Sequence, residues 1–161
     1  VRISKFLGSQ VILLSMIGVP GIYVHSLLGS RNDYEGLEAS KINRRINREK
    51  LNYHLLEKEL KDSKSTRYQI FNKYLKLLDI RKKYTAFSPF SNQEVINLDQ
   101  KVFSILRTDE KTGECILVLV NVSDEHIILD TNYAGKDIIN QENIKHQISL
   151  SPYQYRWILV D

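Results

Sequence analysis

The side chains best suited to holding a polar ligand gather in residues 25–47 and just beyond. This stretch contains the run Arg31-Asn32-Asp33, and it closes on a second cluster, Asn43-Arg44-Arg45-Ile46-Asn47-Arg48. An arginine guanidinium is a planar fork that can bind a carboxylate and a hydroxyl group together. A long polar loop that follows a buried parallel strand is usually functional, because ligands sit at the carboxyl ends of such strands.

Other residue types that could do chemistry are sparse. Cys115 is the single cysteine, which excludes a disulfide framework and a cysteine-rich zinc site, and we expect it to be a small core residue. A single cysteine is compatible with reducing conditions and indicates nothing more about the compartment. We predict a cytoplasmic protein. The spacing of His54, His126 and His146 indicates no shared metal. His25 either lines a pocket or is a structural histidine.

The composition is that of an ordinary globular protein, with 161 residues, 42% of them hydrophobic and 26% charged. Residues 1–85 carry 17 Lys and Arg against 8 Asp and Glu, whereas residues 86–161 carry 6 against 11. The basic residues alternate with acids among helix-spaced leucines, so we expect a solvated helix face and no nucleic-acid partner. The densest apolar run, 11–24, is shorter than the roughly 20 residues of a membrane span, so no membrane partner is predicted.

The first half of the chain has the pattern of an α/β unit. The spacing predicts a helix over 3–17, which Gly18-Val19-Pro20-Gly21 ends, and then a short strand, 22–24, buried on both faces. Residues 25–47 are expected to be a loop. Two amphipathic helices, 49–61 and 66–83, follow it.

After Thr85 the pattern becomes one of strands. Seven short strands separated by turn residues predict an antiparallel β-sandwich: 94–98, 102–108, 115–122, 126–130, 136–140, 146–150 and 153–160. The last strand alternates as a half-buried strand would. Its aromatic residues, Tyr153, Tyr155 and Trp157, form either the core of the sandwich or a platform on which a sugar stacks.

One parallel strand cannot bury both of its faces alone, and residues 1–85 supply no second one. We therefore predict that residues 1–85 are the end of a larger α/β domain, and that residues 86–161 are a separate β-domain. The initial Val1, in place of Met, also predicts a piece of something longer.

Several motifs resemble one enzyme family. Gly18-Val19-Pro20-Gly21-Ile22-Tyr23 resembles the last barrel strand of the α-amylase superfamily (glycoside hydrolase family 13). The runs from His25 to Asp33 and from Ile46 to Leu51 resemble the sucrose phosphorylase branch, which includes enzymes that act on other glucosides such as glucosylglycerate. Val120-Asn121-Val122-Ser123 and Leu150-Ser151-Pro152-Tyr153-Gln154 resemble the β-domain that closes these enzymes. The resemblance extends over essentially the whole chain.

The resemblance implies that residues 1–85 are the end of a (β/α)₈ barrel and that residues 86–161 are its C-terminal β-sandwich. It implies retaining transfer of an α-glucosyl unit through a carboxylate nucleophile, with a glutamic acid as proton donor and phosphate or water as the attacking group. In this family the catalytic carboxylates lie on earlier barrel strands, and nothing here matches them. We therefore expect no catalytic residue, no metal or other cofactor, and no activity from this chain alone.

One substrate-binding role is implied by the resemblance. An arginine just ahead of the I-N-R run holds the outer hydroxyl of the glucosyl ring in sucrose phosphorylases, and Arg44 occupies that position. Arg44 could instead pair only within the loop, and the doubled arginine leaves Arg45 as an alternative contact. Asn32 and Asp33 are expected either to reach an acceptor subsite or to cap and turn the chain. Arg31-Asn32-Asp33 shapes the loop or an outer subsite and is not expected to supply a nucleophile.

Two further readings differ in class. A free-standing carbohydrate- or protein-binding β-module with a helical arm would need exposed aromatic residues on its β-half and a first half that is stable without a barrel. A nucleic-acid binder has only the basic half in its favour. The implied partners of the complete enzyme are an α-glucoside, phosphate, and the missing barrel portion, either in the same chain or in a second chain.

Overall fold

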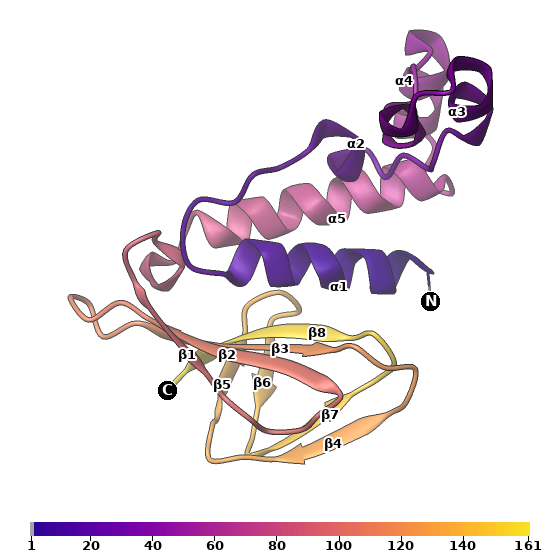
Figure 1. The fold of residues 1–161 in the computed structure, drawn as a ribbon. Helices are drawn as coiled ribbons and strands as arrows, with labels where there is room; N and C mark the ends of the chain where they lie inside the picture. The colour runs from indigo at the N-terminus through magenta and orange to yellow at the C-terminus, as the bar shows by residue number, and fades with distance from the viewer. Residues whose placement is uncertain (1) are drawn as a thin grey trace. The chain divides into compact units, whose positions relative to one another are not determined.

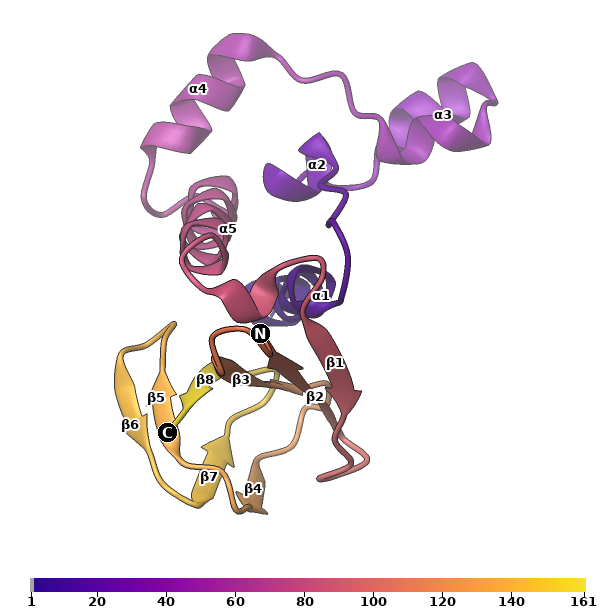
Figure 2. The ribbon, with the colours of Figure 1, turned by 90° about the vertical axis from the view of Figure 1, so that its left-hand side faces the viewer.

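The computed structural model describes residues 2–161, and Arg2 by its backbone alone. It divides into two compact units, which are drawn in Figures 1 and 2. The β unit joins the segment up to Pro20 with Lys76–Asp161, and the helical unit is Gly21–Leu75. No helix among the described residues is long and apolar enough to cross a membrane.

Two antiparallel sheets build the β unit. The larger sheet has the order β1-β2-β3-β8-β5-β6, and the smaller one pairs β4 with β7, which Figure 2 shows as a separate pair. The predicted antiparallel β-domain is thus confirmed. The strands are β1 (Asn92–Val95), β2 (Val102–Thr108), β3 (Cys115–Asn121), β4 (Ile127–Asp130), β5 (Gly135–Asp137), β6 (Glu142–Ile144), β7 (Gln147–Leu150) and β8 (Tyr155–Val160).

An apolar core joins the two sheets. Its fully buried side chains come from both of them, with Leu117 and Ile158 in the larger sheet and Ile148 and Leu150 in the smaller one. In β4 and β7 every second residue is buried, which is the alternation of strands with one face toward a core. Each side chain of this size stabilises the fold by about 1.5–3 kcal/mol when it leaves water completely.

The helix α1 (Arg2–Ser15) packs on β3 of the larger sheet (Figure 1). Its inner face presents Leu7, Val11 and Leu14, all fully buried, at the spacing of 3–4 residues that puts side chains on one side of a helix. Gly8 permits this close approach, since a methyl group there would lie 3.3 Å from Val120 Cγ1. The prediction of a helix over 3–17 is confirmed, with an end two residues earlier.

The prediction that the last strand is half-buried was wrong. β8 lies between β3 and β5, and its residues Arg156, Trp157 and Ile158 are at most 9% exposed. Ile158 joins the core between the sheets, while Trp157 meets Phe87 and Ser15 on the opposite side. Both faces of β8 are covered, so the alternation of residue types along this strand did not mean that one face is exposed to solvent. The three-residue strand β6 was not predicted.

In the helical unit, the predicted buried strand at 22–24 does not form. Ile22 and Tyr23 are irregular, Val24 begins the helix α2 (Val24–Leu27), and the three side chains are 37–53% exposed. A parallel strand needs a neighbouring strand to accept its N–H groups, and none of the described residues supplies one.

The prediction that residues 25–47 form a loop was wrong, because short helices interrupt this segment. After α2 come α3 (Tyr34–Ser40) and the 3₁₀-helix η1 (Asn43–Asn47). The predicted amphipathic pair is present as α4 (Tyr53–Lys61) and α5 (Thr66–Arg81). α4 begins later than predicted because Asn52 caps it, with Oδ1 accepting the Leu55 N–H at 3.0 Å. A second 3₁₀-helix, η2 (Thr85–Phe87), precedes β1.

A buried arginine joins the parts of the β unit. Arg107 is fully buried, and its guanidinium donates hydrogen bonds to four backbone carbonyl groups, those of Ser15, Ser88, Ser91 and Asn92. Burial and, secondarily, the charge of Arg81 lower the pKa of Arg107. The four carbonyl dipoles compensate for the water that this cation loses on folding.

Candidate functional site

A helix C-cap shapes the start of the polar segment. Gly29 adopts the left-handed conformation, with φ of 61°, directly after α2. Its N–H donates to Ser26 O at 3.1 Å and the N–H of Ser30 donates to His25 O at 2.8 Å, which is the Schellman arrangement. Leu-Leu-Gly-Ser in the family-like motif is therefore a stop signal for a helix. The turn at Gly29 ends α2 and is followed in the chain by Arg31.

Arg67 at the beginning of α5 fastens this turn. Its guanidinium donates to Leu28 O at 3.1 Å, to Ser30 Oγ at 3.0 Å and to Glu59 Oε2 at 2.7 Å. A further carboxylate oxygen, of Glu49, lies 3.6 Å away. Sequence reasoning missed Arg67, because a single arginine on an amphipathic helix resembles a solvated one.

His25 belongs to the same network. Its Nδ1 lies 2.9 Å from Ser30 Oγ, and its ring is tilted against that of Tyr23. These contacts favour the structural reading of His25 over a pocket-lining one. A cavity of about 480 Å³ lies beside the network, lined by Gly29, Arg31, Glu49, Glu59, Lys64, Ser65, Thr66 and Arg67.

Asp33 is fully engaged within the helical unit. It caps α3, with Oδ1 accepting the Gly36 N–H at 2.9 Å, and its Oδ2 lies 3.3 Å from Nη2 of Arg45. Its backbone N–H also donates to Ile46 O at 2.7 Å. The structure therefore brings Asp33 against the arginine cluster, although residues 34–42 separate them in the chain.

The two neighbouring arginines have different surroundings. Arg45 is partly buried and binds Asp33 and, at 2.9 Å, the backbone oxygen of Arg48. Arg44 is exposed, and within residues 2–161 its side chain makes no hydrogen bond or ion pair. Successive residues of a 3₁₀-helix point about 120° apart, which explains why adjacent arginines diverge.

Asn32 is exposed and its amide nitrogen donates to the hydroxyl of Tyr34 at 3.2 Å. This contact is local, so it does not bring Asn32 toward Arg44. The structure therefore does not gather the predicted site residues at one point. Asp33 is joined to the arginine cluster through Arg45, whereas Asn32 lies beside α3.

The aromatic residues predicted for the last strand and the lone cysteine lie in the β unit, with Tyr153 just ahead of β8. Trp157 is fully buried and packs on Phe87 at a ring distance of 4.6 Å, which leaves no face for a sugar. Tyr153 is partly covered, with Lys5 Nζ 5.2 Å from its ring centre. Cys115 is only partly buried, at the first residue of β3, and accepts a hydrogen bond from Thr108 Oγ1. It lies at the margin of the core because the strand begins there.

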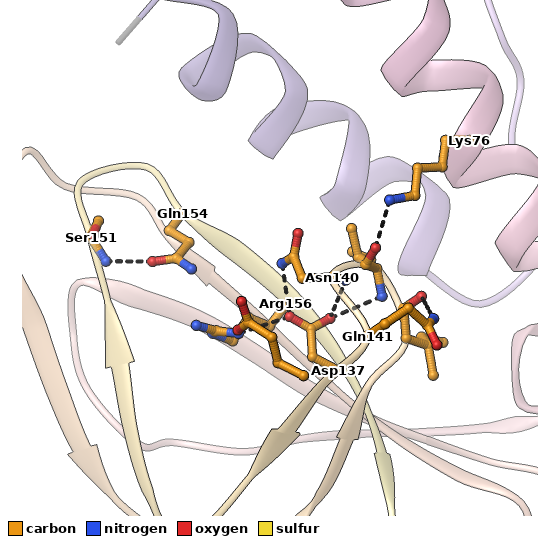
Figure 3. Close-up of polar contacts among 10 residues, drawn as sticks. Lys76, Asp137, Asn140, Gln141, Ser151, Gln154 and Arg156 are labelled. Carbon is orange, nitrogen blue, oxygen red and sulfur yellow. Dashed lines mark hydrogen bonds and ion pairs between the residues drawn. The ribbon is translucent and has the colours of Figure 1, made fainter.

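A polar cluster stabilises β5 and β8 (Figure 3). The fully buried carboxylate of Asp137 accepts hydrogen bonds from Ile139 N, from Asn140 Nδ2 and from Arg156 Nη1 at 2.8–3.0 Å. Arg156 also reaches Glu142 at 2.7 Å, and Lys76 Nζ donates to Ile139 O. Both carboxylate oxygens of Asp137 accept hydrogen bonds from within the β unit, so this cluster stabilises the turn after β5 together with β5 and β8. Among the described residues, no group of three or more His, Cys, Asp or Glu could hold a metal ion.

Solved structures that share the fold include an isomaltulose synthase and a maltogenic amylase. Isomaltulose synthase from a Klebsiella species matches 99% of this chain with a TM-score of 0.69 at 19% identity, over 38% of its own length. Maltogenic amylase from S. marinus matches 96% of the chain with a TM-score of 0.69 at 20% identity, over 19% of its length. At these identities the likeness concerns the fold.

Sequence relatives give a narrower result. A glucosylglycerate phosphorylase of Spirochaeta thermophila is 38% identical over 98% of this chain, and one of Escherichia coli is 36% identical over 98%. The chain spans 30% and 28% of the lengths of these two relatives. No family model matches the sequence. These similarities confirm the predicted resemblance to the C-terminal part of a sucrose phosphorylase-like enzyme of the α-amylase superfamily.

Proposed function

We propose that this chain is the C-terminal part of a retaining α-glucosyl phosphorylase whose substrate class is the small glucosides of the glucosylglycerate type. The observation that carries the proposal is the 38% identity to a glucosylglycerate phosphorylase across 98% of the chain. In this reading, residues 1–85 end a catalytic barrel and residues 86–161 form the β-domain after it. The exposed side chains of Ile22, Tyr23 and Val24 then face barrel strands from another part of the protein or from a second chain.

The reaction needs two carboxyl groups outside residues 2–161. One carboxylate attacks the anomeric carbon, and the glycosidic oxygen leaves with a proton from the other group. A phosphate oxygen then replaces the carboxylate at that carbon while a phosphate proton passes to the second group, so that glucose 1-phosphate forms and both carboxyl groups are restored. The chain by itself is accordingly proposed to be catalytically inactive.

Within this chain, Arg44 is the proposed contact to the glucosyl ring. Support comes from its exposed guanidinium, which has no partner in the described residues, whereas Arg45 is occupied by Asp33. A guanidinium can hold a ring hydroxyl and a barrel carboxylate together. We place Asn32 in the same binding segment as a contact to the acceptor, with its carbonyl oxygen toward ligand hydroxyl groups. Asp33 is part of the same binding segment, in which it is paired with Arg45.

The test is an assay of phosphorolysis with the longer protein that carries this segment. Glucosylglycerate and sucrose are the two substrates, and the quantity measured is the glucose 1-phosphate released. We expect turnover of glucosylglycerate, none by residues 1–161 alone, and a loss of kcat/KM of at least about tenfold in Arg44→Gln. Lys58→Gln, which removes an exposed cation from α4, is the matched control. Turnover by residues 1–161 alone, or an unchanged Arg44→Gln enzyme, would overturn the corresponding part of the proposal.

The same preparation separates this proposal from the binding-module alternative. If residues 1–161 are purified alone and titrated with glucosylglycerate, we expect no binding, because the carboxylates and most of the pocket lie elsewhere. Saturable binding by the isolated chain, with no turnover by the longer protein, would favour the free-standing module.

A further inference from the structure

We propose that Asp33 and Arg45 are positioning residues, whose ion pair holds η1 in the orientation that presents Arg44 to the ligand. The inference rests on the proposed sugar-binding role of Arg44. It assigns to Asp33 a specific task, which is to fix the arginine cluster through Arg45.

Asp33 and η1 are joined at two points. The backbone N–H of Asp33 donates to Ile46 O at 2.7 Å, and the Asp33 carboxylate lies 3.3 Å from Arg45 Nη2. Two contacts from one residue to neighbouring positions of a short 3₁₀-helix fix its rotation as well as its place. At the far end of η1, the carbonyl of Asn47 accepts a hydrogen bond from the hydroxyl of Tyr23 at 2.9 Å.

The ion pair is sheltered enough to act on η1. The Asp33 and Arg45 side chains are 17% and 25% exposed, so solvent screens their attraction less than that of a surface pair. Arg45 also donates to the backbone oxygen of Arg48, which ties the same guanidinium to the end of η1. The exposed side chain of Arg44 makes no hydrogen bond or ion pair in residues 2–161, so its direction is set by the backbone of η1.

Gly36 is a condition for this arrangement. A methyl group at Gly36 would overlap the Asp33 carboxylate and approach Arg45 Nε to 2.8 Å. Both partners of the ion pair pass over the position where a side chain would begin. The spacing Asp33-x-x-Gly36 therefore serves the ion pair as well as the cap of α3.

The test is a double-mutant cycle on the longer, active protein, with glucosylglycerate and phosphate as the probes. Asp33→Asn keeps an oxygen for the Gly36 N–H but removes the charge, and Arg45→Gln removes the partner without altering the cap. We expect each to raise the KM for the glucoside about tenfold with kcat changed less than twofold, and Arg45→Lys to recover part of the loss. Glu57→Gln, which breaks the exposed Glu57–Lys61 pair of α4, should change neither constant.

The decisive comparison is made in the Arg44→Gln background. If Asp33 acts through Arg44, adding Asp33→Asn to Arg44→Gln raises KM no further. Additive effects in the double variant, or wild-type KM in both Asp33→Asn and Arg45→Gln, would overturn the positioning role. An active enzyme in which Arg44→Gln itself has no effect would instead overturn the proposed function of Arg44, so the two failures are distinguishable.

Discussion

Trp157 Nε1 donates a hydrogen bond of 2.8 Å to Ser15 Oγ and so joins β8 to the end of α1 across 142 residues of sequence. Both residues are fully buried, and Ser15 Oγ itself donates to Val11 O at 2.6 Å. The serine hydroxyl thus satisfies the indole N–H and one helix carbonyl together. Together with the hydrogen bond from Arg107 to Ser15 O, this relay supplies polar contacts between α1 and the larger sheet.

Replacing Ser15 by Ala should destabilise the β unit by about 1–3 kcal/mol, because the buried indole N–H loses its acceptor. The free energy of unfolding in urea, followed by tryptophan fluorescence, measures the change. Ser9→Ala is the control, since Ser9 is an exposed serine of the same helix that also bonds a helix carbonyl, Phe6 O. Equal effects of the two variants would contradict a special role for the relay.

Arg107→Lys should destabilise the β unit by roughly 2–4 kcal/mol. A compact ammonium with three donors cannot serve four carbonyl groups at separate places, so buried acceptors remain without partners. Denaturant unfolding gives the value, with Arg31→Lys as an exposed control. A loss below about 0.5 kcal/mol, the usual limit for surface substitutions, would show that the guanidinium hub is dispensable.

Gly29→Ala should cost about 1–2 kcal/mol for the left-handed backbone alone, and more because the new methyl group would lie 2.6 Å from Ile70 Cδ1. Gly21→Ala is the matched control variant, since a methyl group at Gly21 meets no atom within 4 Å. Thermal unfolding of both variants should show a lowered Tm for Gly29→Ala only. A Tm close to that of the wild type for Gly29→Ala would mean that α2 ends without the Schellman turn.

Stability should fall above about pH 10 partly through Tyr155. Burial and, after it, the charge of Asp137 raise the pKa of Tyr155 above its value of 10.0 in the unfolded chain. The folded state then holds a proton that the unfolded state has lost. The contribution is complete below pH 10 and disappears as the pH rises toward the folded pKa.

Urea unfolding at pH 8 and at pH 10.5 tests this prediction. The decline in free energy between the two should be smaller in Tyr155→Phe than in the wild type, whereas Tyr53→Phe, a change at an exposed side chain, should decline like the wild type. The prediction fails if Tyr155→Phe loses as much stability as the wild type over this interval.

Local patterns predicted the elements whose stabilising contacts lie within the described chain. The strand Val102–Thr108 was placed with both bounds correct, and α5 began at the predicted residue. Residues 22–24 differ, because β-branched and aromatic residues indicate a strand only where a neighbouring strand is available. Pattern alone also cannot tell a strand with one covered face from one with two, which is why β8 was misjudged.

For the candidate site, the sequence indicated the two clusters, and their contact could not be foreseen. The ion pair of Asp33 with Arg45 depends on how the chain turns between α3 and η1, where Lys41 is left-handed, and no spacing rule gives that turn. Arg67 was missed for a similar reason, since its partners come from two separate segments, with Leu28 and Ser30 in the turn after α2 and Glu59 in α4.

The position of β8 in its sheet sets an order for folding. It is the last strand along the chain, yet it lies in the middle of the larger sheet, between β3 and β5. The hairpin of β5 and β6 has no other partner strand in that sheet, so it cannot join β1, β2 and β3 until β8 enters between them. Until β8 is available, the β1–β3 meander and the β5–β6 hairpin therefore each keep an unpaired strand edge, which is a site of aggregation in an unfinished sheet.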